Sequence, residues 1–177
     1  ANGARDARHR VEHIEVILPG DIPRFAELGA IASVQPPHPP GAMDFPHEPC
    51  RSRIGPARWH LAYAWRSLKQ AGAHVVFASD WPVARIDVLA GIHAAVNRIP
   101  WEPHLPDQSF TLHEAIAAYT VEGAHAEHAE DRKGRLKPGY FADFVLLSGD
   151  IEAVPADRIN TLAPVLTVCG GRVTFEA

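Results

Sequence analysis

Residues 74–83, His-Val-Val-Phe-Ala-Ser-Asp-Trp-Pro-Val, constrain the fold most, because an apolar run there delivers a single carboxylate at its end. Residues 75–77 are β-branched or aromatic, a pattern typical of a strand buried on both faces of a parallel sheet. Parallel α/β folds bind ligands at the C-terminal ends of their strands. Asp80 is therefore a candidate functional residue, although aspartate is also a common turn former.

The composition is that of a globular chain of ordinary domain size. Its 177 residues are 46% hydrophobic, and 17 basic and 21 acidic side chains give a formal net charge of −4. No basic stripe indicates a nucleic acid, and no apolar run approaches the roughly 20 residues of a membrane-spanning helix. Residues 1–10 are polar and charged rather than signal-like, and Cys50 and Cys169 match no metal or redox spacing. We therefore expect a cytoplasmic protein without nucleic-acid or membrane partners.

The first part of the chain alternates strands with helices. Polar and apolar residues alternate over 9–17, which predicts a strand carrying His13. A helix is predicted over 22–28 and a second strand over 30–35. The Pro-rich residues 36–55 then form a long loop, and loops of such length are usually functional or mobile.

Further helices flank the strand that leads to Asp80. Residues 56–71 begin with proline and end before a glycine, which predicts one helix, and an apolar stripe predicts another over 88–99. Thr111 and Glu114 form the pattern of a capping box, so a helix is expected to begin there.

From residue 134 onward short β-prone runs replace the helices. They lie at 143–148, 165–169 and 172–175, and a Gly-Gly turn separates the last two. This pattern predicts a sheet built from hairpins, distinct from the α/β part.

Five ordered motifs in this chain resemble the C-terminal portion of the amidohydrolase superfamily. They are Arg-Val-Glu-His-Ile at 10–14, Ala-Ser-Val-Gln-Pro-Pro-His at 32–38, Ala-Ser-Asp-Trp-Pro-Val at 78–83, the capping-box helix at 111–120 and the segment 134–147. The most similar branch is amidohydrolase-3, with N-acyl-D-amino-acid deacylases, formamide deformylases and AepA-like proteins. The resemblance covers nearly the whole chain.

The resemblance implies an α/β fold in two parts. Residues 1–133 would form the C-terminal part of a (β/α)₈ TIM barrel with about three strands. Residues 134–177 would form the C-terminal part of the family's small β-sandwich domain. The function it implies is metal-dependent hydrolysis of a C–N bond in a small amide or N-acyl substrate.

The resemblance also assigns roles to particular residues. His13 matches the metal-ligand histidine of barrel strand six. Asp80 matches the aspartate at the end of strand eight, which contacts the metal or its water and accepts the proton of that water. Histidine and carboxylate are ordinary zinc ligands, so zinc is the divalent metal expected in the complete enzyme. For His13 the alternative is a histidine that merely packs on a strand face.

Two further residues are candidates for substrate binding. His38 follows the second predicted strand and is expected to face the substrate, although a loop histidine among prolines is more often solvent exposed. Trp81, beside Asp80, is expected to line the pocket, although an aromatic residue at a strand end more often belongs to the core.

The chain departs from the family pattern in the metal ligands it lacks. The family's His-x-His pair, its mid-barrel ligand and its strand-five histidine have no counterpart, and only three of eight barrel strands are identifiable. We therefore expect a fragment of a longer enzyme or a truncated product, inactive alone. Because catalytic zinc usually has three protein ligands, the isolated chain need not hold metal. Open sheet edges favour a homo-oligomer.

A second hypothesis is a non-catalytic α/β module that associates with itself or binds small molecules. Metal content distinguishes the two, because near-stoichiometric zinc in the purified chain favours the hydrolase.

Overall fold

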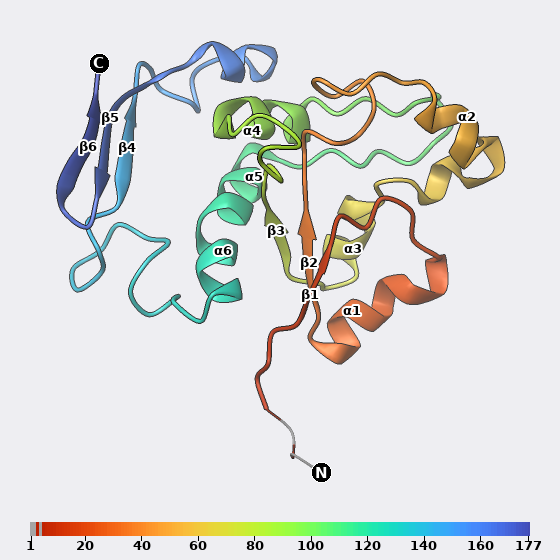
Figure 1. Ribbon diagram of the computed structural model, residues 1–177, viewed down its shortest axis with the longest axis horizontal. Coiled ribbons are helices and arrows are strands. Elements are labelled where there is room, and N and C mark those ends of the chain that lie inside the picture. The colour runs from red at the N-terminus through yellow and green to blue at the C-terminus, as the bar shows by residue number, and fades with distance from the viewer. Residues whose placement is uncertain (1–2, 4) are drawn as a thin grey trace.

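Two three-stranded sheets organise the part of the chain that the structure describes, residue 3 and residues 5–177. In the computed structural model a parallel sheet comprises β1 (Arg10–Glu12), β2 (Ile31–Val34) and β3 (Val75–Phe77). An antiparallel sheet at the C-terminal end comprises β4 (Phe144–Leu147), β5 (Pro164–Cys169) and β6 (Arg172–Glu176), and it stands to one side of the parallel sheet (Figure 1). The predicted α/β class is confirmed.

In the parallel sheet β2 is the central strand. Ala32 pairs with Val11 of β1 on one side and with Val75 of β3 on the other. Every residue of β2 and β3 is buried, as the apolar run at 75–77 predicts, whereas β1 is exposed along its length. The edge of the sheet formed by β3 is therefore covered, whereas the edge formed by β1 is open.

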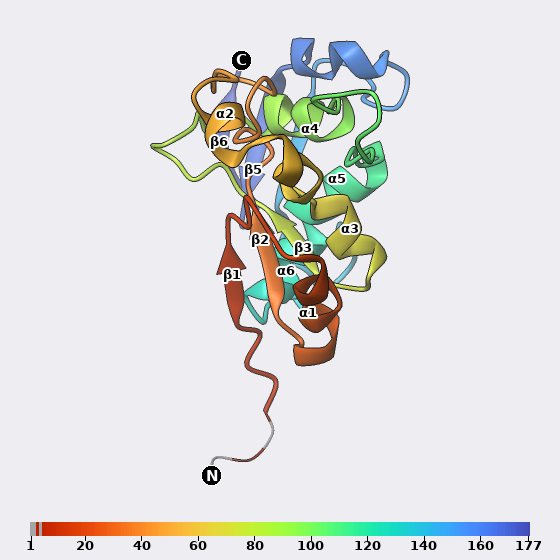
Figure 2. The same ribbon diagram turned by 90° about the vertical axis from the view of Figure 1, so that its right-hand side faces the viewer.

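Helices cover the sheet beside β2 and β3. Helix α3 packs against both strands and α1 lies beside α3, while α5 and α6 pack against β3 (Figure 2). No helix in the described residues is long and apolar enough to cross a membrane. The helices are α1 (Ile22–Leu28), α2 (Cys50–Ile54), α3 (Trp65–Gln70), α4 (Val88–Val96), α5 (Leu112–Tyr119) and α6 (Val121–Ala126), with 3₁₀ turns at Pro19–Asp21, Pro56–Leu61 and Ala156–Thr161.

Capping side chains fix where α4 and α5 begin. Asp87 Oδ1 accepts a hydrogen bond from the Ala90 backbone N–H at 3.0 Å, at the start of α4. Thr111 and Glu114 form the predicted capping box, in which each side chain accepts a hydrogen bond from the backbone N–H of the other. Such caps satisfy N–H groups that have no partner inside the helix.

The strand predicted over residues 9–17 ends at Glu12, so the prediction was too long. His13 and Ile14 adopt left-handed backbone, with φ of 70° and 50°. Val16 forms an antiparallel bridge with Ala62 instead of continuing along β2. The alternation of polar and apolar residues therefore ran across two extended segments that a sharp turn separates.

The prediction of a single helix over residues 56–71 is wrong. The stretch divides into a 3₁₀ turn and α3, with Tyr63 between them at a left-handed φ of 50°. The Tyr63 backbone N–H donates to the Glu15 carbonyl at 2.7 Å, so a long-range pairing replaces the helical bond. The proline-rich loop at 36–55 also contains one short helix, α2, that its composition did not predict.

The C-terminal segment contributes to the core as well as to the antiparallel sheet. Ile159, between β4 and β5, is 1% exposed and belongs to the same buried cluster as Phe77. The strands β5 and β6 pair across Gly170 and Gly171, so the predicted hairpin is confirmed. The division of the chain into two domains at residue 134 stays a prediction.

Candidate metal centre

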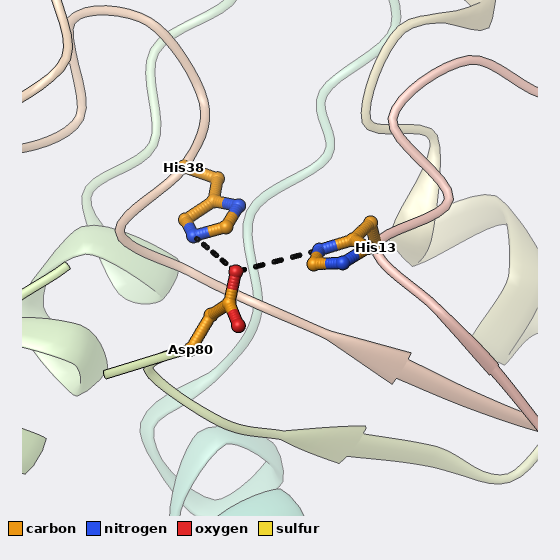
Figure 3. Close-up of side chains that lie close together, drawn as sticks. All are labelled: His13, His38 and Asp80. Atoms are coloured by element: carbon orange, nitrogen blue, oxygen red, sulfur yellow. Dashed lines mark ion pairs between the residues drawn. The ribbon is translucent and has the colours of Figure 1, made fainter. Parts of the chain in front are cut away.

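The three parallel strands each deliver one polar side chain to the same end of the sheet. His13 directly follows β1, His38 follows β2 after a short Pro-containing turn, and Asp80 lies three residues beyond β3. Parallel neighbouring strands end at a common edge, so these residues converge although 67 positions separate the first from the last. Figure 3 shows the two imidazoles pointing toward the Asp80 carboxylate.

Asp80 is the common partner of both histidines. Its Oδ2 lies 3.9 Å from His13 Nδ1 and 3.8 Å from His38 Nε2. The two imidazole rings are stacked, with centroids 5.7 Å apart. One potential ligand atom from each of the three side chains lies within 4.8 Å of those from the other two.

His13, His38 and Asp80 form what we call the metal cluster. His38 is its most buried member, at 6% exposure, in contrast to the exposed position that is common for loop histidines. Its ring packs edge-on against Phe45, and its backbone N–H donates to the Gln35 carbonyl at 2.9 Å. The Nε2 atom is buried, has no hydrogen-bond partner among the described residues and faces Asp80. A buried polar atom without a partner is costly, which indicates a ligand at this position.

Two residues that the sequence did not single out hold the histidines. Glu15 Oε1 lies 3.6 Å from His38 Nδ1, and the interaction with this imidazole lowers the pKa of Glu15 against the opposing effect of burial. Gln35 Oε1 lies 3.1 Å from His13 Nδ1. Glu15 lies two positions after His13, a spacing that a sequence search could have used. A carboxylate commonly orients a metal-binding imidazole through the ring nitrogen that does not bind the metal, and Glu15 contacts His38 in this way, whereas Gln35 contacts the same His13 nitrogen that lies nearest Asp80.

Unusual backbone conformations gather around the cluster. Among the described residues six non-glycine residues have positive φ, and four of them surround the site, namely His13, Ile14, Tyr63 and Asp80. A left-handed conformation costs on the order of 1–3 kcal/mol at a residue that does not favour it, and such strain concentrates at functional sites. A β-branched residue such as Ile14 is a particularly rare occupant of this region.

A cavity of about 550 Å³ opens beside the cluster. It is lined by all three cluster residues, by the carboxylates of Glu15 and Glu48, and by a largely apolar wall, which consists of Pro40, Phe45, Pro46, Pro49, Cys50, Tyr63 and Val83. Burial raises the pKa of Tyr63, so its phenol stays protonated and can donate a hydrogen bond. The volume lies in the range of small-molecule sites.

Trp81 does not join the other candidates. Its side chain is 66% exposed, and the described residues that line the cavity do not include it, although Val83 is among them. Its assignment to substrate binding stays a prediction.

The cluster fits a divalent cation. Two imidazoles and one carboxylate are the usual number of protein ligands at a catalytic zinc site. Ligand atoms about 2.0–2.2 Å from a tetrahedral zinc ion lie about 3.4 Å apart. The separations of 3.8 and 3.9 Å to Asp80 Oδ2 are a few tenths of an ångström longer, and the ligand atoms of all three residues lie within 4.8 Å of one another, so the side chains would have to rotate inward to hold the ion. In this arrangement the ion would be the partner that His38 Nε2 lacks among the described residues.

Two curated relatives cover most of this chain. The Protein LONG AFTER FAR-RED 3 of Arabidopsis thaliana is 38% identical over 151 residues, which are 84% of this chain and 25% of that protein. The Putative amidohydrolase YtcJ of Bacillus subtilis is 32% identical over 178 aligned positions, 97% of this chain and 33% of that protein. The chain thus spans between a quarter and a third of these relatives.

Solved structures share the fold. An uncharacterized metal-dependent hydrolase from Pyrococcus furiosus matches with a TM-score of 0.59 and 27% identity, over 75% of this chain and 26% of that one. Atrazine chlorohydrolase TrzN from Arthrobacter aurescens, complexed with zinc, matches with a TM-score of 0.64 and 21% identity, over 94% and 36%. The sequence profile of the Amidohydrolase family matches residues 1–175. The chain therefore belongs to the amidohydrolase family, in the amidohydrolase-3 branch that its motifs predicted.

Proposed function

We propose that this chain supplies the C-terminal part of the active site of a zinc-dependent amidohydrolase, which cleaves the C–N bond of a small amide or N-acyl substrate. The observation that carries the proposal is the convergence of His13, His38 and Asp80 at one end of the sheet, where a buried imidazole nitrogen has no hydrogen-bond partner in the part of the chain that the structure describes. Family membership and the metal-dependent hydrolase among the structural neighbours support the reaction class. The alternative of a non-catalytic module is not favoured.

The residues of the cluster take different roles in this proposal. His13 and His38 would hold the ion, and Glu15 orients the His38 ring so that Nε2 faces Asp80. A bound divalent cation lowers the pKa of water and polarises a carbonyl group. Asp80 would be the third ligand of the ion and acts as general base: its carboxylate accepts a proton from the attacking water and passes it to the leaving nitrogen as the C–N bond breaks. The wall formed by Phe45 and the prolines binds the apolar part of the substrate.

The proposal requires further strands to close the barrel. A closed barrel needs roughly 200 residues, and the parallel sheet here has three strands with β1 as an exposed edge. We propose that upstream strands complete the barrel and that the 177-residue chain alone is inactive and self-associates through uncovered edges. Its three potential ligands lead us to expect zinc binding even in the isolated chain.

Metal removal tests the function. The chain joined to the upstream part of its own gene is expected to hydrolyse N-formyl and N-acyl amines, to lose this activity on dialysis against a chelator and to regain it with Zn²⁺ but not with Mg²⁺. Mass spectrometry of the metal content should find close to one zinc per isolated chain. Activity that survives complete removal of metal would contradict the proposal, as would an isolated chain that binds no zinc.

A further inference from the structure

We infer that Trp65 is a positioning residue of the metal centre, whose indole N–H holds the backbone of His13 and Ile14 and thereby fixes where the His13 imidazole points. The inference rests on the proposed function, because it takes His13 as a metal ligand. It assigns a role in the site to a core side chain of α3 that does not line the cavity.

The indole contacts the two carbonyl groups that follow β1. Trp65 Nε1 lies 3.1 Å from the His13 carbonyl oxygen and 3.0 Å from the Ile14 carbonyl oxygen, and it donates to both. The Trp65 side chain is 2% exposed, so solvent has little access to the indole. A carbonyl that loses its donor in such surroundings is left without a partner, which is unfavourable.

These bonds complete the restraint on His13. On its N-terminal side the His13 backbone N–H donates to the Ser33 carbonyl at 2.8 Å, which ties it to the end of β2. On its C-terminal side the carbonyl is held by Trp65. Both peptide groups that flank the His13 Cα are therefore fixed, and with them the direction of Cβ. Because the left-handed φ values of His13 and Ile14 are intrinsically unfavourable, the surrounding structure must supply such restraints.

Trp65 is itself held in place by a partly buried cation. The Arg98 guanidinium lies 5.5 Å from the Trp65 ring centre and 5.6 Å from the Tyr63 ring centre, and its Nη1 donates to the Tyr63 carbonyl at 2.6 Å. Burial lowers the pKa of Arg98 to about 10, so the group remains charged at neutral pH. The Tyr63 and Trp65 rings meet edge to face, with centroids 5.4 Å apart. The indole thus has little freedom to move away from the two carbonyls.

A purely structural tryptophan would give a different result from a positioning one, and Trp59 provides the comparison. Trp59 Nε1 donates to the Arg51 carbonyl at 3.0 Å, a bond of the same kind that does not touch the residues of the metal cluster. Replacing either tryptophan by phenylalanine removes one indole donor and keeps an aromatic ring. Only the change at Trp65 removes support from a metal ligand.

The experiment compares the 177-residue chain with Trp65→Phe and Trp59→Phe. A chain carrying benzothienylalanine at position 65 is included, because this isostere keeps the shape of tryptophan but has no N–H group. Three readouts are measured: the zinc affinity from competition with a chelating dye, the backbone ¹³C chemical shifts of His13 and Ile14 in the metal-free chain, which report left-handed conformation, and the absorption spectrum of bound Co²⁺. The absorption spectrum of bound Co²⁺ reports the geometry of the centre.

For Trp65→Phe and for the isostere we expect zinc affinity to fall about 10–100-fold, the effect typical of removing a partner that orients a ligand. The ¹³C shifts of His13 and Ile14 should move away from left-handed values and the Co²⁺ spectrum should change, whereas Trp59→Phe leaves all three as in the original chain. Zinc affinity within twofold of the original chain and unchanged shifts in the isostere would overturn the inference. Failure of the original chain to bind zinc would instead contradict the proposed function, and the ¹³C shifts would still decide whether Trp65 fixes His13.

Discussion

Asp80→Asn is expected to lower kcat of the enzyme completed by its upstream part by at least about 10²-fold, with the fold intact. Asparagine has nearly the shape of aspartate but cannot accept a proton from water at neutral pH, so the proposed general base is lost. The carboxylate is also the group that both histidines face, at 3.8 and 3.9 Å from Oδ2, so its removal weakens the hold on the metal as well.

The measurement is steady-state kinetics at saturating zinc, beside circular dichroism of each variant. Asp131→Asn is the matched control, since Asp131 is exposed and is not one of the residues that line the cavity. If the Asp80→Asn enzyme kept more than half of its rate, the assignment of Asp80 as general base would be wrong.

His38→Ala is expected to weaken zinc binding by about 10² or more, because the loss of a direct ligand should exceed the 10–100-fold effect of losing an orienting partner. This prediction separates two roles for His38. A ligand must change the affinity for metal, whereas a residue that binds only substrate would raise KM and leave metal affinity unaltered. The buried, partnerless Nε2 favours the ligand role over the substrate-facing role expected from the sequence.

Zinc affinity of the isolated chain, measured by competition with a chelator, tests this prediction. His104→Ala is the control, because His104 is exposed in a loop and is not part of the cluster. If the His38→Ala chain and the original chain bound zinc with equal affinity, His38 would not be a metal ligand, and the substrate-binding role expected from the sequence would be favoured.

The sequence predicted those parts of the fold that short patterns determine. The buried run at 75–77, the capping box at Thr111 and the hairpin around Gly170 each depend on a few neighbouring residues, and all three occur in the structure. The position of Asp80 beyond a strand end followed from the same reasoning, whereas the strand predicted over 9–17 placed His13 within it, and the resemblance to a family made His13 a candidate metal ligand.

The remaining features depend on contacts between distant segments, which no local pattern contains. His38 is buried, and Phe45 of the same proline-rich loop packs edge-on against its ring, whereas composition alone indicated an exposed loop. The helix predicted over 56–71 is interrupted because Tyr63 pairs with Glu15, which is 48 positions away in the sequence. The role inferred for Trp65 has the same origin, since the carbonyl groups it holds lie on a different strand-end segment.

The central claim is that His13, His38 and Asp80 together hold one divalent metal ion. Anomalous diffraction at the zinc absorption edge, from crystals of the zinc-loaded protein, tests it most directly. The account predicts a single peak between these three side chains, about 2.0–2.2 Å from a nitrogen of each imidazole and from an Asp80 carboxylate oxygen. A zinc peak coordinated by other residues, with no metal ion bound to His38 Nε2, would contradict it.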